Sequence, residues 1–207
     1  MKKIALVLVL LTGFYFANAQ DENTKGDEKK AGFKKENLFV GGDLTLGFSN
    51  LYTALGISPY FGYSLNKYVD VAASFNLNYI SQRDYVVYGD KVRQTVYGPG
   101  VFVRVYPIKF LFAQAQFEHN FTREKYLPAQ NSGYLQSTNR VDANSFLVGA
   151  GYAGGRDEYN KSCYYFSVSW DLLRNSNSPY VDGLSRAIPI IKAGYNIALF
   201  QGKRSRY

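Results

Sequence analysis

The stretch Gly98–Phe121, GPGVFVRVYPIKFLFAQAQFEHNF, repeats with a period of two on both sides of a Tyr-Pro turn. Every second residue is apolar from Val101 to Val105 and again from Leu111 to Phe117. The residues between them include Arg104, Gln114, Gln116 and Glu118. Because successive side chains of a β-strand point to opposite faces, this pattern predicts two antiparallel strands, at about 93–106 and 109–122.

The same alternation extends in both directions along the chain, from Leu38 onward. The predicted strands are 38–48, 52–64, 68–81, 93–106, 109–122, 142–154, 161–173 and 188–200. Each stretch is about ten residues or longer, which is enough to cross an outer membrane in a tilted strand. The expected fold is all-β, an eight-stranded antiparallel up-and-down transmembrane barrel over residues 38–200.

The composition of the polar face favours a membrane barrel over a soluble lipocalin-like binder, the alternative fold. A soluble barrel would place Lys and Glu on that face to keep it in water. Here the face is rich in small residues, which suit the crowded lumen of a narrow barrel. The glycines on it are Gly41, Gly47, Gly56, Gly62, Gly98, Gly100, Gly149, Gly151 and Gly194.

The few charged residues on the polar strand faces would then lie in the lumen. Charges removed from water need partners of opposite sign. We expect Arg104 to pair with Glu118 across neighbouring strands, and Lys192 to pair with Asp171 or, if the first and last strands meet, with Asp43.

The N-terminal segment is typical of an exported protein. A basic start, the apolar run 4–16 and the small residues Ala17-Asn18-Ala19 predict a cleaved signal peptide over 1–19. The charged segment 20–37 predicts a flexible N-terminal extension. One Cys in the whole chain, Cys163, excludes an intramolecular disulfide. The net charge of +8 falls to about +6 when Lys2 and Lys3 are removed with the signal peptide, and this mild charge does not indicate nucleic acid as a partner.

The predicted connections alternate between short and long. The turns at 65–67, 107–108 and 155–160 are short, whereas 82–92, 123–141 and 174–187 are longer. Bacterial barrels have short periplasmic turns and long extracellular loops. We therefore expect the N-terminus and the tail 201–207 to lie in the periplasm, with the three long loops facing outward.

The last strand, KAGYNIALF, resembles the C-terminal signal that barrel-assembly machinery recognises, with Gly194, Ile197, Leu199 and Phe200 as its pattern. Together with GISPYFGYSLNKYVDVAASFNLNY and the opening stretch, it makes residues 38–200 similar to the outer membrane protein beta-barrel family of small OmpA- and OmpX-type barrels. The resemblance implies an outer-membrane location and the barrel fold. It supplies no catalytic residues, and the tail 201–207 departs from relatives that end at the aromatic residue.

Few residues offer chemistry. His119, the single His, is a weak candidate for a lipid-modifying rim enzyme near Glu118 and Glu124, but Phe121 stands where such enzymes carry Ser. The motif Gly149–Gly154 matches G-x-G-x-x-G, yet it lies inside a strand, so no cofactor is expected. One His and one Cys cannot form a metal site, and Cys163 is expected to fill space.

Basic residues cluster near the expected outer rim, and Arg forks bind phosphate well. Contact with lipopolysaccharide phosphates is one interpretation, and ordinary solvated loops are the other. The functional hypothesis is a non-enzymatic structural, adhesive or accessory subunit that contacts outer-membrane lipid. The barrel-assembly machinery is the expected partner during insertion, and a larger envelope complex is a further expected partner. A small-solute pore is the main alternative.

The basic residues that cluster near the expected outer rim are Arg83, Lys91, Arg93, Arg123, Lys125, Arg140, Arg174 and Arg186.

Overall fold

The computed structural model describes residues 33–48, 52–156, 161–182 and 185–200. It contains a short 3-10 helix, η1 (Lys35–Asn37), and eight strands. The strands are β1 (Leu38–Phe48), β2 (Tyr52–Ser64), β3 (Val69–Arg83), β4 (Lys91–Ile108), β5 (Leu111–Leu127), β6 (Ser137–Gly154), β7 (Cys163–Asp171) and β8 (Ile190–Ala198). The predicted signal peptide, most of segment 20–37 and the tail 201–207 lie outside the described residues.

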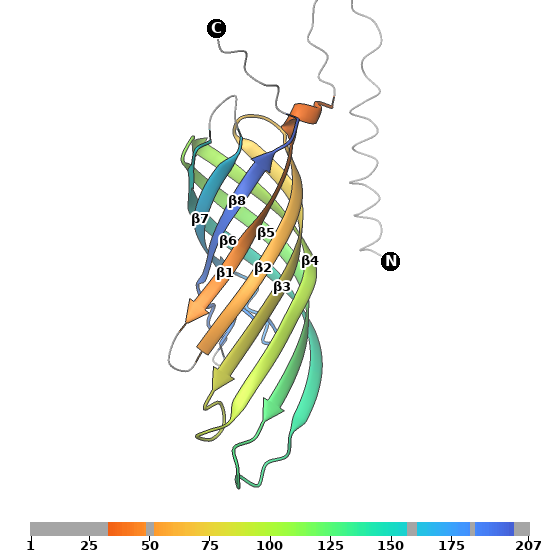
Figure 1. Cartoon of the computed structure of the whole chain (residues 1–207), viewed down its shortest axis with the longest axis vertical. Coiled ribbons are helices and arrows are strands. Elements are labelled where there is room, and N and C mark those ends of the chain that lie inside the picture. The colour runs from red at the N-terminus through yellow and green to blue at the C-terminus, as the bar shows by residue number, and fades with distance from the viewer. Residues whose placement is uncertain (1–32, 49–51, 157–160, 183–184, 201–207) are drawn as a thin grey trace, which may run out of the picture. The chain divides into compact units, whose positions relative to one another are not determined.

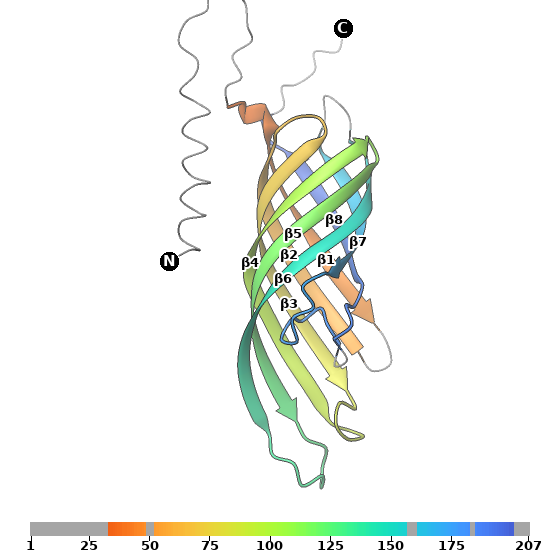
Figure 2. The ribbon, with the colours of Figure 1, turned by 180° about the vertical axis from the view of Figure 1, so that it is seen from behind.

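The eight strands form one closed antiparallel barrel in sequence order, with β8 pairing back onto β1 (Figure 1). This confirms the predicted fold. Connections β2–β3, β4–β5 and β6–β7 lie at the end where β1 begins, which we call the turn end. Connections β1–β2, β3–β4, β5–β6 and β7–β8 lie at the other end, the loop end (Figures 1 and 2). Within the described ranges, no helix is long and apolar enough to span a membrane.

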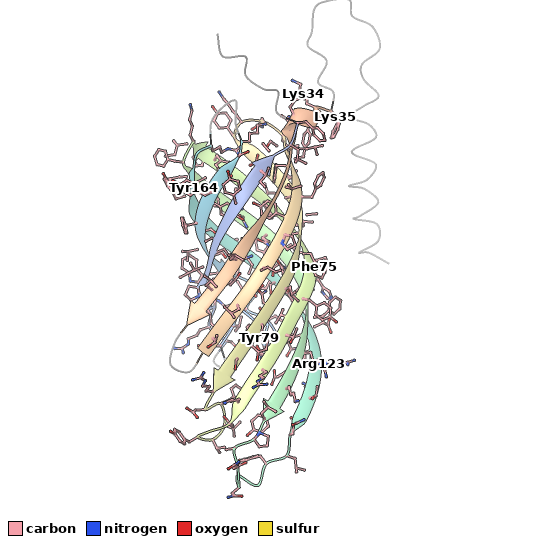
Figure 3. The ribbon with its side chains drawn as sticks, in the orientation of Figure 1. Lys34, Lys35, Phe75, Tyr79, Arg123 and Tyr164 are labelled. Carbon is pink, nitrogen blue, oxygen red and sulfur yellow. The ribbon has the colours of Figure 1, made fainter. Side chains whose placement is uncertain are left out.

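Apolar side chains cover the outside of the barrel. Residues such as Ile57, Phe75 and Val101 are about half exposed to the surroundings. Figure 3 shows Phe75, Tyr79 and Tyr164 projecting away from the strands. A soluble barrel would bury these side chains, so the soluble alternative is wrong and the exterior matches a hydrocarbon solvent.

Side chains of the other parity fill the interior. Aromatic residues near the turn end pack against one another, with Tyr60 and Phe102 ring centroids 5.3 Å apart in an edge-to-face arrangement. Two glycines permit this packing. A Cβ atom on Gly62 would overlap the ring of Phe39, and one on Gly151 would overlap the ring of Phe112. Large rings therefore fit into a narrow lumen because the residues they cover have no side chain.

Strands β3 to β6 are longer at the loop end than the sequence pattern predicts. About half of the expected loop 123–141 is strand, because β5 and β6 stay paired from Leu111↔Tyr152 out to Tyr126↔Ser137. Likewise, β3 and β4 stay paired as far as Arg83↔Lys91. The side chains of these extensions are mostly polar on both faces, so the alternation of apolar and polar residues that predicts a strand is missing there. These extensions form a projecting sheet beyond the ends of β7 and β8 (Figure 1).

Candidate functional site

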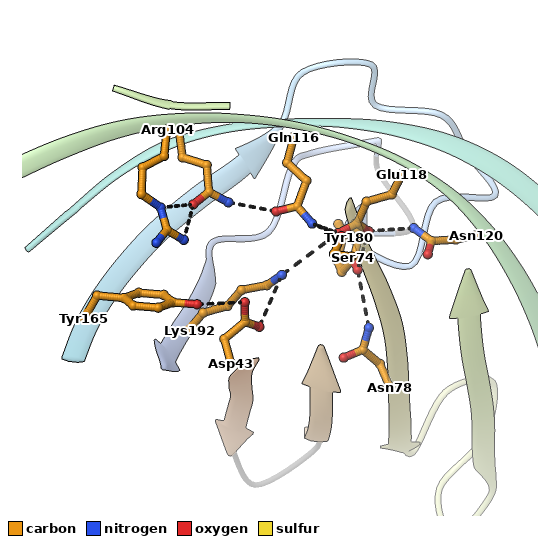
Figure 4. Close-up of polar contacts among 11 residues, drawn as sticks. Asp43, Ser74, Asn78, Arg104, Gln116, Glu118, Asn120, Tyr165, Tyr180 and Lys192 are labelled. Atoms are coloured by element: carbon orange, nitrogen blue, oxygen red, sulfur yellow. Dashed lines mark hydrogen bonds and ion pairs between the residues drawn. The ribbon is translucent and has the colours of Figure 1, made fainter. Parts of the chain in front are cut away.

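Three charged residues meet in the middle of the lumen. The Lys192 ammonium lies 3.6 Å from Asp43 Oδ1 and 3.9 Å from Glu118 Oε1 (Figure 4). All three side chains are almost completely buried. The structure thus contains the Asp43–Lys192 pair that closure of β1 onto β8 implied, and Lys192 neutralises a second carboxylate that the sequence did not assign to it.

Arg104 and Glu118 do not pair directly, which corrects the sequence expectation. Arg104 lies opposite Gln114 in the β4–β5 register, whereas Glu118 lies opposite Gly100, about 13 Å further along the strands. Arg104 donates to Gln114 Oε1 at 2.8 and 3.0 Å instead. Gln114 donates to Gln116, which donates to Glu118, so a chain of amides joins the two charges.

Aromatic rings rather than a carboxylate surround the Arg104 guanidinium. Its central carbon lies 4.3 to 5.0 Å from the ring centroids of Tyr165, Phe112 and Phe102. A cation over a ring face is attracted by the ring quadrupole, more strongly where water is excluded. Arg104 is only 2 % exposed. Its guanidinium and the surrounding rings therefore fill the lumen at a level that an open channel would have to leave free.

The β7–β8 connection folds into the barrel mouth at the loop end. The Tyr180 hydroxyl donates to Glu118 Oε2 at 2.8 Å and accepts from Asn78 Nδ2 at 3.4 Å. The Ser178 hydroxyl donates to Asp171 Oδ2 at 2.7 Å. Only the part of this connection around Ser178 and Tyr180 departs from the expected solvent-facing loop, because it turns inward and forms a plug held by buried hydrogen bonds.

Asp171 also differs from its predicted role as a partner of Lys192. In the β7–β8 register Lys192 lies opposite Ser167, four residues from Asp171. Asp171 instead accepts backbone N–H bonds from Phe146 and Leu173, both at 3.0 Å, beside the bond from Ser178. Its carboxylate fixes the start of the plug segment rather than a charge pair.

A second ion pair spans the turn end. Arg156, in the β6–β7 connection, donates two bonds to the Asp70 carboxylate at 2.8 and 3.2 Å. Its guanidinium also lies 3.9 Å from the Tyr106 ring centroid. The sequence analysis missed this pair because Arg156 lies outside the predicted strands and 86 residues from Asp70. The pair lies over the lumen at this end.

His119 lies on the outer face of the barrel, whereas Glu118 points into the lumen. The His119 Nδ1 atom is 2.7 Å from Asn144 Oδ1, and its ring packs edge-on against Phe121 at 4.7 Å. Neither neighbour is a base or a nucleophile. Within the described part of the chain, the histidine has no carboxylate or hydroxyl partner, and no group of three His, Cys, Asp or Glu residues could hold a metal ion.

The remaining sequence candidates have structural positions. Gly149–Gly154 lies within β6, and Cys163 is buried among aromatic residues at the turn end. Gly194 lies under the Tyr165 ring. Strand β8 ends at Ala198, two residues earlier than expected, although the Leu199 N–H still donates to Leu38 O at 2.8 Å. The role of Gly194, Ile197, Leu199 and Phe200 as an assembly signal stays a prediction.

The projecting sheet has one open edge. Strand β6 pairs with β7 only over Leu147–Gly154, so within the described residues 137–145 have a strand neighbour on the β5 side alone. The β3–β4 turn is closed by Asp90, which accepts backbone N–H bonds from residues 85–87 and a hydroxyl bond from Tyr126 at 2.9 Å. Hydrogen bonds to Asp90 therefore stabilise the β3–β4 turn of the projecting sheet, whereas the edge formed by residues 137–145 of β6 has no strand neighbour among the described residues.

Comparison with known proteins gives structural similarity at low identity. No protein-family model matches the sequence, and no curated protein matches it significantly. The attachment invasion locus protein Ail of Yersinia pestis, solved with the heparin analogue sucrose octasulfate, is 10% identical with a TM-score of 0.44, covering 77% of this chain and 96% of Ail.

Two further solved structures are similar in the same range. The N-terminal β-barrel domain of Pseudomonas aeruginosa OprF is 14% identical with a TM-score of 0.41, covering 78% of this chain and 95% of that domain. Neisserial surface protein A is 15% identical with a TM-score of 0.40, covering 78% and 97%. The strand pairing and the apolar exterior of the chain itself, rather than these alignments, support its assignment as a transmembrane barrel.

Proposed function

We propose that the protein is a non-enzymatic barrel of the bacterial outer membrane that docks another polypeptide on its projecting sheet, as an adhesive or accessory subunit. The open edge of β6 carries this proposal. The turn end faces the periplasm and the projecting sheet faces outward, in keeping with the lengths of the connections. The side chains that fill the lumen make the barrel rigid, and they leave no path for solute transport.

Backbone geometry defines the docking edge. The Phe146 N–H and C=O point to the β7 side, where they bond to Asp171 and Leu172. Because these groups alternate in direction along a strand, those of Asn144 and Asp142 point the same way, toward solvent. An unpaired edge of this kind accepts an added strand through main-chain hydrogen bonds.

Proline substitution tests the edge selectively. Proline removes one N–H, which is tolerated where that group faces solvent. We expect Asp142→Pro with Asn144→Pro to abolish binding to an array of extended peptides with alternating Val and Thr. The matched control, Asp142→Ala with Asn144→Ala, keeps both N–H groups and retains binding. Equal binding by the two double variants, or no binding by the parent protein, contradicts the proposal.

The pore alternative makes a separate prediction. Tyr180, the Arg104 stack and the Arg156–Asp70 pair each lie across the lumen at a different level. Eight strands also leave an interior just wide enough for side chains. We therefore expect no steady conductance in planar bilayers, and a stable open current would show that the barrel is a channel.

A further inference from the structure

The outward face of the projecting sheet carries a concentrated set of cations. On strands β3 to β6, side chains of one parity continue the lipid-facing surface beyond the row Leu77–Tyr97–Phe121, which we call the aromatic row. Tyr79 lies in the first row beyond it, opposite Thr95. Six of the eight basic residues that the sequence analysis grouped at the rim fall on this single face. They are Arg83, Lys91, Arg93, Arg123, Lys125 and Arg140.

Strand register places these cations opposite one another rather than opposite acids. Arg83 faces Lys91 across β3–β4, Arg93 faces Lys125 across β4–β5, and Arg123 faces Arg140 across β5–β6. Like charges directly opposite each other destabilise a sheet. None of the six forms an ion pair with any residue that the structure describes. Because three like-charged pairs on one face repel one another, an anion from outside the chain would stabilise them.

Acidic residues of the same region are engaged elsewhere, with one exception. Glu124 points to the opposite face of the sheet and accepts from Gln94 at 3.2 Å. Asp90 and Asp84 accept backbone N–H bonds within the β3–β4 turn. Asp142 shares the cationic face but makes no ion pair with a described residue. The face therefore keeps a strong positive charge of its own.

We propose that this face binds the phosphates of a polyphosphorylated glycolipid, of the lipid A type, in the outer leaflet. Arg123 and Arg140 line a shallow hollow of about 440 Å³ beside Tyr97 and Phe121 of the aromatic row. Asp142 also lines this hollow, so it contains two cations and one carboxylate. Figure 3 shows Arg123 projecting outward from the sheet beyond Phe75 and Tyr79. Arg forks suit phosphate, and the rings suit the acyl-chain boundary.

The cationic face extends further along the membrane normal than the headgroup layer of a phospholipid, which favours a glycolipid as its ligand. Successive rows lie two residues apart, or roughly 5 Å along the membrane normal for a strand tilted by about 40°. The three rows therefore extend to about 15 Å beyond the aromatic row, whereas one headgroup layer of a bilayer is only about 5–7 Å thick. A sugar headgroup that carries several phosphates reaches rows that a single phosphate cannot.

The test measures lipid retained by the protein in nanodiscs. Protein extracted from cell envelopes is reconstituted with phosphatidylcholine containing bisphosphoryl lipid A, monophosphoryl lipid A or neither, and bound lipid is counted by native mass spectrometry. We expect retention of bisphosphoryl lipid A, weaker retention of the monophosphoryl form, and about a ten-fold loss in R123Q/R140Q. The matched control R174Q/R186Q removes two charges from the plug segment and should stay within about two-fold.

Each other outcome contradicts the inference. Equal losses in the two double variants, or equal retention of both lipid A forms, would show that no built phosphate site exists. Binding of heparin oligosaccharide without retention of lipid A would assign the face to a soluble polyanion. The inference rests on the proposed outer-membrane placement, and the two fail differently: a chain that does not enter the bilayer refutes the placement, whereas one that enters without retaining lipid A refutes only the phosphate site.

Discussion

The lumen and the projecting sheet treat charge in opposite ways. In the lumen, Lys192 contacts two carboxylates and Arg156 contacts Asp70, and all of these side chains are almost fully buried. On the projecting sheet, arginines and lysines face one another without acidic partners. A buried charge without a partner is costly, whereas a hydrated one is not. Charges with acidic partners thus lie inside the closed barrel, and charges without them lie on the face that we propose binds phosphate.

The largest expected effect on stability is the loss of the buried Lys192 charge in the lumen. Lys192→Met leaves Asp43 and Glu118 buried near each other without a cation, so the free energy of unfolding should fall by about 3–5 kcal/mol. Lys125→Met, the matched change on the projecting sheet, should alter it by less than about 0.5 kcal/mol. Urea unfolding in detergent micelles, followed by heat-shifted gel mobility, measures both. Similar losses at the two positions would refute the distinction.

A smaller effect is expected where the plug enters the lumen. Tyr180→Phe removes the hydroxyl that donates to Glu118 and should lower the free energy of unfolding by about 1–3 kcal/mol, because a buried carboxylate loses a hydrogen bond. The control is Tyr88→Phe, at a loop-end residue that is 92% exposed. If both variants unfold at the same urea concentration as the parent protein, the plug contributes nothing to stability.

The smallest effect is local and depends on pH. Burial raises the pKa of the Asp90 carboxyl, but bonds from Val87, Val86 and Tyr85 N–H and from the Tyr126 hydroxyl outweigh it, so the pKa lies below its ordinary value. A carboxyl with a lowered folded pKa stabilises above its unfolded pKa, about 4, and loses this contribution as pH falls through the folded value.

Amide hydrogen exchange in the β3–β4 turn measures this effect. Protection of residues 85–87, relative to the Asp90→Asn variant at the same pH, should be fully present above about pH 4 and decline as the pH falls below that value through the lowered pKa of Asp90. The lumen strands should keep their protection over the same range. A difference between the parent protein and the Asp90→Asn variant that does not change with pH would show that the charge of the carboxylate does not close the turn.

Sequence periodicity predicted the barrel but not the full lengths of its strands. Strands β1 and β2 match their predicted bounds, because apolar residues on one face give a strong period-two pattern. The loop ends of β5 and β6, residues 123–127 and 137–141, were predicted as part of a loop. Both of their faces are polar there, and pairing between neighbouring strands, rather than an apolar face, maintains them.

The charge contacts show where sequence reasoning reaches its limit. Parity predicted that Asp43, Arg104, Glu118, Asp171 and Lys192 all face inward, but parity carries no information on height along the barrel. Register decides which inward residues meet, and it separates Arg104 from Glu118 and Asp171 from Lys192. Register also aligns the rim cations into one face, which a list of basic residues could not show.

The sequence by itself determined the fold class and which residues face outward from the barrel. A period of two separates the two faces of each strand, and the small residues of the polar face assign that face to the narrow lumen. Only the tertiary structure decided that the β7–β8 connection folds inward, that Arg156 pairs with Asp70, and that β6 ends in an open edge. These features depend on contacts between segments far apart in sequence, so their physical cause is the closure of the barrel rather than any local pattern.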